Sequence, residues 1–367
     1  MKPQTAITGK PVAGMRALWL RCQTSPANNR WLAGRVVAAR ILIGVIVLIC
    51  AEVFSGGSLK VGLWHPWTVA VTYWLYFAHF FFFTTLAVRT SRTSLSALYL
   101  WGVLFGLYES WITKVIWYGY SGDGKFAMGH IGPYGFSEIS MVFFFHPVIS
   151  FILPLSITCL LCPSLRRTFP ELAWFTGQTR GARVVQAYFV LAFAPVMAIN
   201  SGSVLNLAAN LAVAIILLAA LLRLARPALA ATDGLDIVVF ARRGFAGLCI
   251  YLGGLYGIGY IAMNPAGRPA TAIQLFTFVF YAVALAGLWA HRKREPLATA
   301  SVADRETRLV TKLFVLVFVL ALALSLLRSE PLLYPVIALH FSIWTILGFV
   351  LAVLALAKGA RESVRSG

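Results

Sequence analysis

Charged residues are few in this sequence, and acidic ones are the scarcest. Only 12% of the 367 residues are charged, with 12 Asp and Glu against 31 Lys and Arg, whereas 60% are hydrophobic. A soluble domain carries about 25% charged and roughly 45–50% apolar residues. No polar stretch is long enough to enclose a core of its own, which excludes a soluble multidomain protein. The composition therefore predicts an all-α, polytopic transmembrane helix bundle.

Cysteine is scarce too, and its placement argues against a disulfide framework. None of the five cysteines falls in a segment predicted to face outside. Cys159 and Cys162 form a CxxC pair at the end of an apolar helix, where packing is favoured over redox chemistry. The chain has no N-x-S/T acceptor for glycosylation. No A-x-A-like cleavage site follows the first apolar run, so we expect that run to be a retained span and not a signal peptide.

Ten apolar segments approach the roughly 20 residues that a helix needs to cross a membrane. The division between the fifth and the sixth rests on the polar turn sequence Asn200–Ser203. The chain then divides into a basic cytoplasmic segment 1–35, a helix bundle 36–357 and a cytoplasmic tail 358–367. The ten predicted spans are residues 36–56, 67–88, 95–117, 138–160, 184–200, 204–222, 244–263, 271–290, 309–327 and 335–357.

The basic residues predict that both termini face the cytoplasm. With the N-terminus inside, 26 of the 31 Lys and Arg lie on the cytoplasmic side, where such residues gather in membrane proteins. The net charge of +19 is then entirely cytoplasmic. Anionic lipid headgroups are a sufficient partner for it, and nucleic acid is not expected. We expect a multi-pass protein of the cell (inner or plasma) membrane, whose partners are membrane lipids.

Glycines predict which spans pack inside the bundle. Gly102 and Gly106 are spaced four apart in the third span, and five glycines lie within residues 247–259 of the seventh. Small residues at such spacing let helix backbones approach closely. Spans three and seven are therefore expected to be interior helices.

Ionisable residues within the membrane are costly, so they indicate functional sites. Nearly all of them converge on the predicted outer half of the first four spans. At about 1.5 Å per residue, Glu109 lies roughly 12 Å and Lys114 roughly 5 Å below the outer boundary. On one continuous helix these two side chains point about 140° apart, so each needs a partner elsewhere. We expect Glu52 or Glu138 beside Lys114, and His146 or a bound cation beside Glu109.

These residues form the candidate site. Carboxylates at shallow depth would supply general acid–base chemistry, and a lysine would hold a phosphate. The catalytic candidates are Glu109, Glu138 and Lys114. The substrate-binding candidates are Glu52, His65, Lys125, His130 and His146.

The glycine-rich connection between spans three and four allows two interpretations. It is either a plain outer loop or one that presents backbone N–H groups to an anion. Its near match to the nucleotide-binding pattern GxxxxGK[ST] fails because Phe126 stands where a hydroxyl residue is required. No ligand-pair spacing on one helix indicates a metal site, and no motif identifies a cofactor.

Three functions fit this pattern. The first is a membrane-embedded transferase or hydrolase acting on a lipid or lipid-linked substrate at the outer leaflet. The second is a secondary transporter, for which ten spans with short loops are a common layout. Transporter sites, however, lie near the midplane between structural repeats, and no repeat is visible here. The third is a non-catalytic assembly subunit, which leaves the intramembrane charges without a role.

Overall fold

The computed structural model describes residues 30–120, 122–123, 125–126, 128–172, 179–231, 234–296, 307–327 and 330–365. Predictions for residues 1–29, including Cys22, and for Gly124, Arg305 and Arg328 lie outside this part of the chain. Within it the fold is all-helical apart from one antiparallel hairpin, which pairs β1 (His130–Ile131) with β2 (Tyr134–Gly135). The predicted fold class is confirmed.

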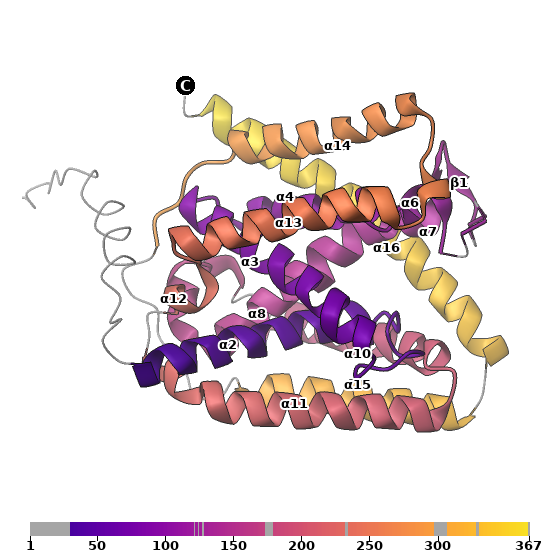
Figure 1. The fold of residues 1–367 in the computed structure, drawn as a ribbon, viewed down its shortest axis with the longest axis horizontal. Coiled ribbons are helices and arrows are strands. Elements are labelled where there is room, and N and C mark those ends of the chain that lie inside the picture. The colour runs from indigo at the N-terminus through magenta and orange to yellow at the C-terminus, as the bar shows by residue number, and fades with distance from the viewer. Residues whose placement is uncertain are drawn as a thin grey trace, which may run out of the picture.

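Nine helices of the described residues are long and apolar enough to cross a membrane. Figure 1 shows several of them, including α2, α11, α13 and α14, running lengthwise through the molecule, with the hairpin at one end of the bundle. We call that end the hairpin end; it is the predicted outer side. The spans are built from α2 (Arg30–Leu48) with η1 (Ile49–Val53), η2 (Thr68–Thr72) with α3 (Tyr73–Arg89), α7 (Phe136–Ser140) with η3 (Met141–Ile152) and α8 (Leu153–Leu161), α10 (Arg180–Asn200), α11 (Val204–Ala231), α12 (Leu235–Val238) with α13 (Arg242–Ala262), α14 (Thr271–Ala290), α15 (Thr307–Leu327) and α16 (Glu330–Val364). Short 3-10 turns occur at η4 (Pro163–Arg167), η5 (Pro170–Leu172) and η6 (Pro265–Gly267).

The segment predicted as the third span is a broken helix. α4 (Leu95–Gly106) begins at Ser94, whose side chain accepts a hydrogen bond from the Ala97 N–H, as N-cap residues do. Two single-turn helices follow, α5 (Tyr108–Trp111) and α6 (Val115–Tyr118). Lys114, between them, has a φ of +62°, a left-handed conformation that cannot continue a helix. The expectation of one continuous helix over 95–117 is therefore wrong, and no glycine or proline marks the break between 107 and 117.

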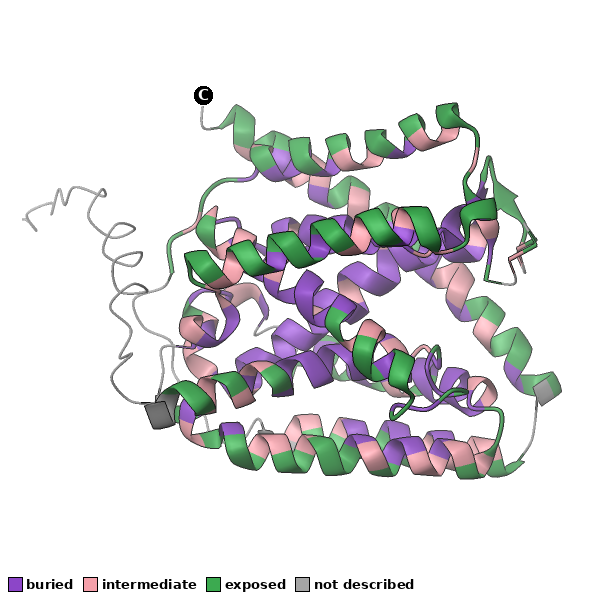
Figure 2. Cartoon of the chain, viewed as in Figure 1, coloured by how far each residue is buried: buried purple, intermediate pink, exposed green. Residues whose placement is uncertain are grey.

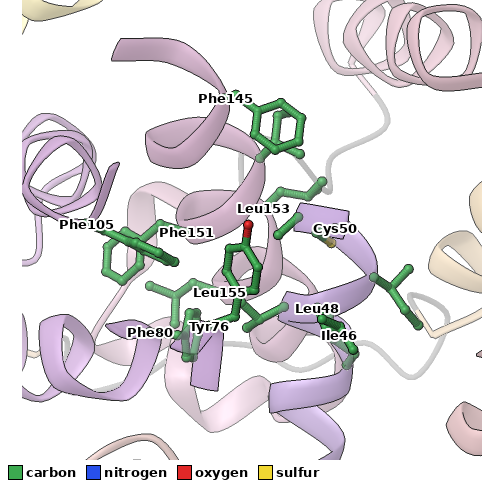
Figure 3. Close-up of a cluster of buried hydrophobic side chains, with 14 of the residues drawn as sticks. Ile46, Leu48, Cys50, Tyr76, Phe80, Phe105, Phe145, Phe151, Leu153 and Leu155 are labelled. Carbon is green, nitrogen blue, oxygen red and sulfur yellow. The ribbon is translucent and has the colours of Figure 1, made fainter. Parts of the chain in front are cut away.

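The core lies where α2, α3, α4 and η3 meet. These elements are largely buried, whereas α13, α14 and α16 carry long exposed stretches (Figure 2). Figure 3 shows the interior of this core, with Tyr76 and Phe80 of α3 close to Phe105 of α4 and Phe151 of η3. Aromatic rings therefore fill the region that lies next to the candidate site.

Glycines allow a close contact between α4 and η3, but they also led to one wrong prediction, for α13. A Cβ on Gly102 would lie 2.5 Å from the Cα of Pro147, and one on Gly106 would lie 3.0 Å from the carbonyl oxygen of Val142. α4 thus packs directly against η3, and its predicted interior position is confirmed. In contrast, a Cβ on Gly253, on Gly254 or on the nearby glycines 247 and 257 of α13 would meet no atom of another element within 4 Å. α13 is mostly exposed, so its predicted interior position is wrong.

Arginines at the end opposite the hairpin hold helix ends together. Arg40 donates to the carbonyl oxygen of Asp236 at 2.7 Å and also to those of Ile237 and Val239, which close the C-terminus of α12. Arg89 donates to the carbonyl oxygen of Phe240 at 2.8 Å. Cations beside the carbonyls of a helix C-terminus are favourable. These side chains are therefore part of the fold.

Candidate functional site

A buried carboxylate–imidazole pair lies at the break in the α4–α6 segment. Glu109 of α5 and His146 of η3 are 5% and 0% exposed, and Glu109 Oε1 lies 3.1 Å from His146 Nε2. The expected partner for Glu109 is therefore confirmed. The close packing of α4 on η3 at Gly102 and Gly106 brings these two residues together from 37 positions apart.

Hydrogen bonds fix the orientation of both members of the pair. The Thr113 hydroxyl donates to Glu109 Oε2, and His146 Nδ1 lies 3.1 Å from the hydroxyl of Ser150. Because a carboxylate oxygen accepts, Nε2 carries the proton, and in the neutral ring Nδ1 then accepts from Ser150. The Glu109–His146 pair is thus held in one tautomer by two hydroxyl groups that the sequence analysis did not single out.

A second carboxylate, Glu52, belongs to the same cluster. Its Oε2 accepts a hydrogen bond from the Ser58 hydroxyl at 2.8 Å, and it also interacts electrostatically with Glu109 and His146. The hydroxyl of Tyr76 interacts with the Glu52 carboxyl group and lies 2.9 Å from the hydroxyl of Tyr108. These phenol groups link Glu52 to the residue that directly precedes Glu109.

The third carboxylate, Glu138, opens α7 beneath the hairpin. It is 3% exposed, accepts a hydrogen bond from the Ser137 hydroxyl at 2.6 Å and interacts electrostatically with Glu109 and His130. A Cβ on Gly135 would lie 2.2 Å from Glu138 Oε2. The glycine in β2 therefore gives the backbone room to cover this carboxylate.

Tyr120 is a surface residue that neighbours the carboxylate cluster. It interacts electrostatically with Glu52, Glu109 and Glu138, yet it is 62% exposed. The sequence analysis did not select it, although it follows Gly119 and opens the glycine-rich connection. All three carboxylates thus have one partly exposed side chain, Tyr120, as a neighbour at the hairpin end.

Lys114 faces away from the carboxylates. It is fully buried, and its ammonium donates to the carbonyl oxygens of Gly259, at 2.8 Å, and Met263. Those carbonyls end α13, so Lys114 caps a neighbouring helix. The expected pairing with Glu52 or Glu138 is wrong.

Three other candidates lie on the surface of the hairpin end. His65 Nδ1 accepts from the Trp67 N–H at 3.2 Å, and the Lys125 N–H donates to Asp123 at 3.0 Å. His130 is exposed and stacks edge-on against Phe126. His130 also interacts electrostatically with Glu138, one of the cluster carboxylates. Within the described residues, no three His, Cys, Asp or Glu side chains are grouped as metal ligands.

Comparison with known proteins identifies the family. A protein of Archaeoglobus fulgidus, described as uncharacterized, is 38% identical over 117 residues, which are 32% of this chain and 36% of that protein. The match therefore spans about a third of the length of this curated relative. No solved structure shows a significant match. A family model described as an uncharacterized membrane protein family matches residues 41–365. The chain belongs to this family and is a multi-pass membrane protein.

Proposed function

We propose that this protein is a membrane-embedded enzyme that uses the Glu109–His146 pair for proton transfer on a lipid or lipid-linked substrate at the outer leaflet. The oriented pair, with its 3.1 Å contact, carries the proposal. A buried carboxylate bound to an imidazole of defined tautomer is a common arrangement for general acid–base catalysis. The reaction class is a group transfer or a hydrolysis, in which a nucleophile must lose a proton and a leaving group must gain one.

The roles follow from the hydrogen bonds. Glu109 is the base, because its carboxylate is already held by His146 and Thr113 and needs no reorientation. Glu52 is the acid, and the hydroxyls of Tyr76 and Tyr108 connect it to the region of Glu109. Two carboxylates on opposite sides of a reacting group can divide the two proton transfers between them.

Serine chemistry at Ser150 is a weaker alternative within the same proposal. Ser150, His146 and Glu109 form a hydrogen-bonded chain with the residue types of a catalytic triad. Ser150, however, is fully buried among core residues of η3 and lies on the side of His146 away from Glu109. Its role is to orient the imidazole.

The structure changes the proposed binding of a headgroup. The Lys114 ammonium is bonded to two backbone carbonyls, so it is not available for a phosphate. Lys125, at the exposed hairpin end, would be the cation that meets an anionic headgroup.

A secondary transporter is the second candidate, and the broken α4–α6 helix favours it. Discontinuous helices are typical of transporter binding sites, where they occur near the membrane midplane in corresponding positions of two repeats. Here the break lies toward the hairpin end. In the part of the second half that the structure describes, α13, α14, α15 and α16 run without such a break.

Lipid extracts test the enzyme proposal directly. Cells expressing the wild-type protein should contain at least one lipid species whose amount changes relative to empty cells, as measured by untargeted mass spectrometry. Glu109→Gln should abolish that change, because the amide cannot accept the proton, while Glu295→Gln in an exposed loop should not. Equal expression and equal melting temperature establish that both variants fold.

Two results would contradict the proposal. One is a lipid profile of Glu109→Gln that matches the wild type. The other is an unchanged lipid profile in all strains combined with Glu109-dependent solute uptake by sealed vesicles, which would replace the enzyme by a transporter.

A further inference from the structure

A groove between α3 and α13 opens toward the membrane and is separate from the carboxylate cluster. In Figure 1, α13 passes across the face of the bundle next to α3, and the two helices are in contact. The α13 side chains in the groove are spaced three and four apart, so they share one face of the helix. The groove is lined by His79, Phe82 and Phe83 of α3 and by Cys249, Gly253 and Tyr256 of α13.

The floor of the groove is uncharged and fully hydrogen-bonded. His79 is 1% exposed, and its Nδ1 lies 2.8 Å from the carbonyl oxygen of Leu75. Because that oxygen only accepts, Nδ1 carries the proton, and Nε2 accepts from the Tyr256 hydroxyl at 3.3 Å. The His79 ring is therefore an uncharged surface with both of its nitrogens hydrogen-bonded, which suits an apolar ligand.

The open space in the groove comes from a glycine. Gly253 is exposed, and a Cβ built on it would meet no atom within 4 Å. Cys249, one turn earlier on the same face of α13, is exposed as well. Cys249 has a small side chain, and Gly253 has none. A helix face with small residues leaves a channel that a larger side chain would fill.

The depth of the groove determines what can occupy it. Cys249 lies seven residues from the start of α13 and Tyr256 six residues from its end, which places both roughly 9–10 Å inside the helix ends. The membrane core is about 30 Å thick, so the groove lies at the level of the hydrocarbon. α13 is mostly exposed there, so the groove is continuous with the lipid-facing surface.

From these observations we propose that the groove is a binding site for one hydrocarbon chain of a membrane lipid. The occupant lies along the α13 face that carries Cys249 and Gly253, against the rings of His79 and Phe82. This site goes beyond the proposed enzyme function and does not depend on it.

The groove is nevertheless close to the carboxylate cluster. The ring of His79 is stacked on that of Phe105, with centroids 5.1 Å apart, and lies 5.3 Å from the ring of Tyr108. Tyr108 in turn contacts Tyr76 and His146. The rings of His79 and Tyr108 thus lie in succession between a bound chain and the Glu109–His146 pair.

Photo-crosslinking in vesicles tests the site without any assay of activity. The probe is a phosphatidylcholine with a diazirine near the end of one acyl chain, added at low mole fraction to unlabelled phosphatidylcholine vesicles containing the full protein. Peptide mapping should find adducts concentrated in residues 79–83 and 249–256, well above those on the exposed face of α14 at Leu275 and Phe276.

Matched glycine variants make the test specific. Gly253→Leu should remove the concentrated adducts, because the new side chain fills the groove, whereas Gly254→Leu should leave them in place. Both glycines are exposed with open space around them, so neither change is expected to impair folding. Cys249→Phe, which fills the same groove from another position, should repeat the effect of Gly253→Leu.

Either of two outcomes would overturn the proposal. Adducts spread evenly over the exposed faces of α13, α14 and α15 would show ordinary contact with bulk lipid only. Identical adduct maps for Gly253→Leu, Cys249→Phe and Gly254→Leu would show that the groove holds no chain.

Discussion

The ammonium of Lys114 donates a 2.8 Å hydrogen bond to the carbonyl oxygen of Gly259, and this contact joins the broken α4–α6 segment to the end of α13. Lys114 makes this contact from a left-handed backbone conformation. The residue therefore closes one helix while it interrupts another. The Glu109 turn lies directly before this junction.

Replacing Lys114 should cost stability. Lys114→Met removes both hydrogen bonds from the charged ammonium to the end of α13, at a cost of about 1.5–3 kcal/mol. The melting temperature in detergent should fall, whereas Lys60→Met at an exposed position should not lower it. An unchanged melting temperature for Lys114→Met would contradict the capping role.

Thr113 should matter through its hydroxyl alone. Thr113→Val removes the donor to Glu109 Oε2, so turnover of the lipid identified with the wild-type protein should fall by about tenfold or more, as for a lost orienting contact. Thr113→Ser keeps the donor and should restore turnover. If Val and Ser variants behave alike, the hydroxyl does not orient the base.

Glycine substitutions should have opposite effects in α4 and α13. Gly102→Leu would place side-chain atoms against the backbone of Pro147 and should destabilise the protein by about 1–3 kcal/mol or more. Gly254→Leu has open space and gains helix propensity, so its melting temperature should equal or exceed that of the wild type. Thermal unfolding in one detergent compares the two, and equal destabilisation would contradict the exposed position of α13.

Stability at acid pH should depend on Glu171. Burial alone would raise the pKa of this carboxyl, but hydrogen bonds from the Leu95 N–H and from Arg294 outweigh it and lower the pKa below the ordinary value. The stabilisation is therefore complete above the unfolded-state value of about 4.3 and is lost as pH falls through the folded-state value. Glu171→Gln should lower stability by about 1.5–3 kcal/mol at pH 7. The difference from wild type should shrink at lower pH, and a gap that stays constant down to pH 3 would argue against the assignment.

Cysteine labelling of the loops tests whether the broken α4–α6 segment crosses the membrane. In a background without native cysteines, Lys60→Cys and Arg268→Cys should react with an impermeant thiol reagent from outside, and Lys293→Cys only after the membrane is opened. These three positions are spread along the chain on both predicted sides. Labelling of Lys293→Cys but not Arg268→Cys from outside would show that residues 95–118 do not cross the membrane.

The pairing of Glu109 with His146 could be predicted because a buried carboxylate requires a partner, and few candidates existed at that depth. The direction in which the Lys114 side chain points could not be predicted. The 140° argument assumed one continuous helix, and nothing in the residues 107–117 indicates a left-handed position at 114. The glycines of α13 led to the wrong prediction that this helix is interior. Small residues allow close packing, but they do not show that a partner helix is present.

The supporting hydroxyls divide into two kinds. Tyr76 and Tyr108 meet only when α3 and α5 are brought together. Thr113 and Ser150 lie four residues after Glu109 and His146, so their hydrogen bonds are local, and this spacing was a signal in the sequence that could have identified them. Depth can be counted along a sequence, but the angular position of a side chain in an irregular segment cannot. Both irregular elements, the α4–α6 break and the π-helical η3, carry members of the pair, and π-helical turns are frequent at functional sites.

The arginine contacts to helix ends have a consequence for assembly of the protein in the membrane. Arg40, Arg89 and Arg92 belong to the predicted cytoplasmic excess of basic residues, and each donates to a backbone carbonyl far away in the sequence, in α12, in the α12–α13 connection and in α14 respectively. The same charge would thus act twice, first keeping a segment from being translocated and then fastening that segment to its neighbours. Neutralising one of these arginines would affect both steps, so a misoriented chain and a loosened bundle would arise from a single substitution.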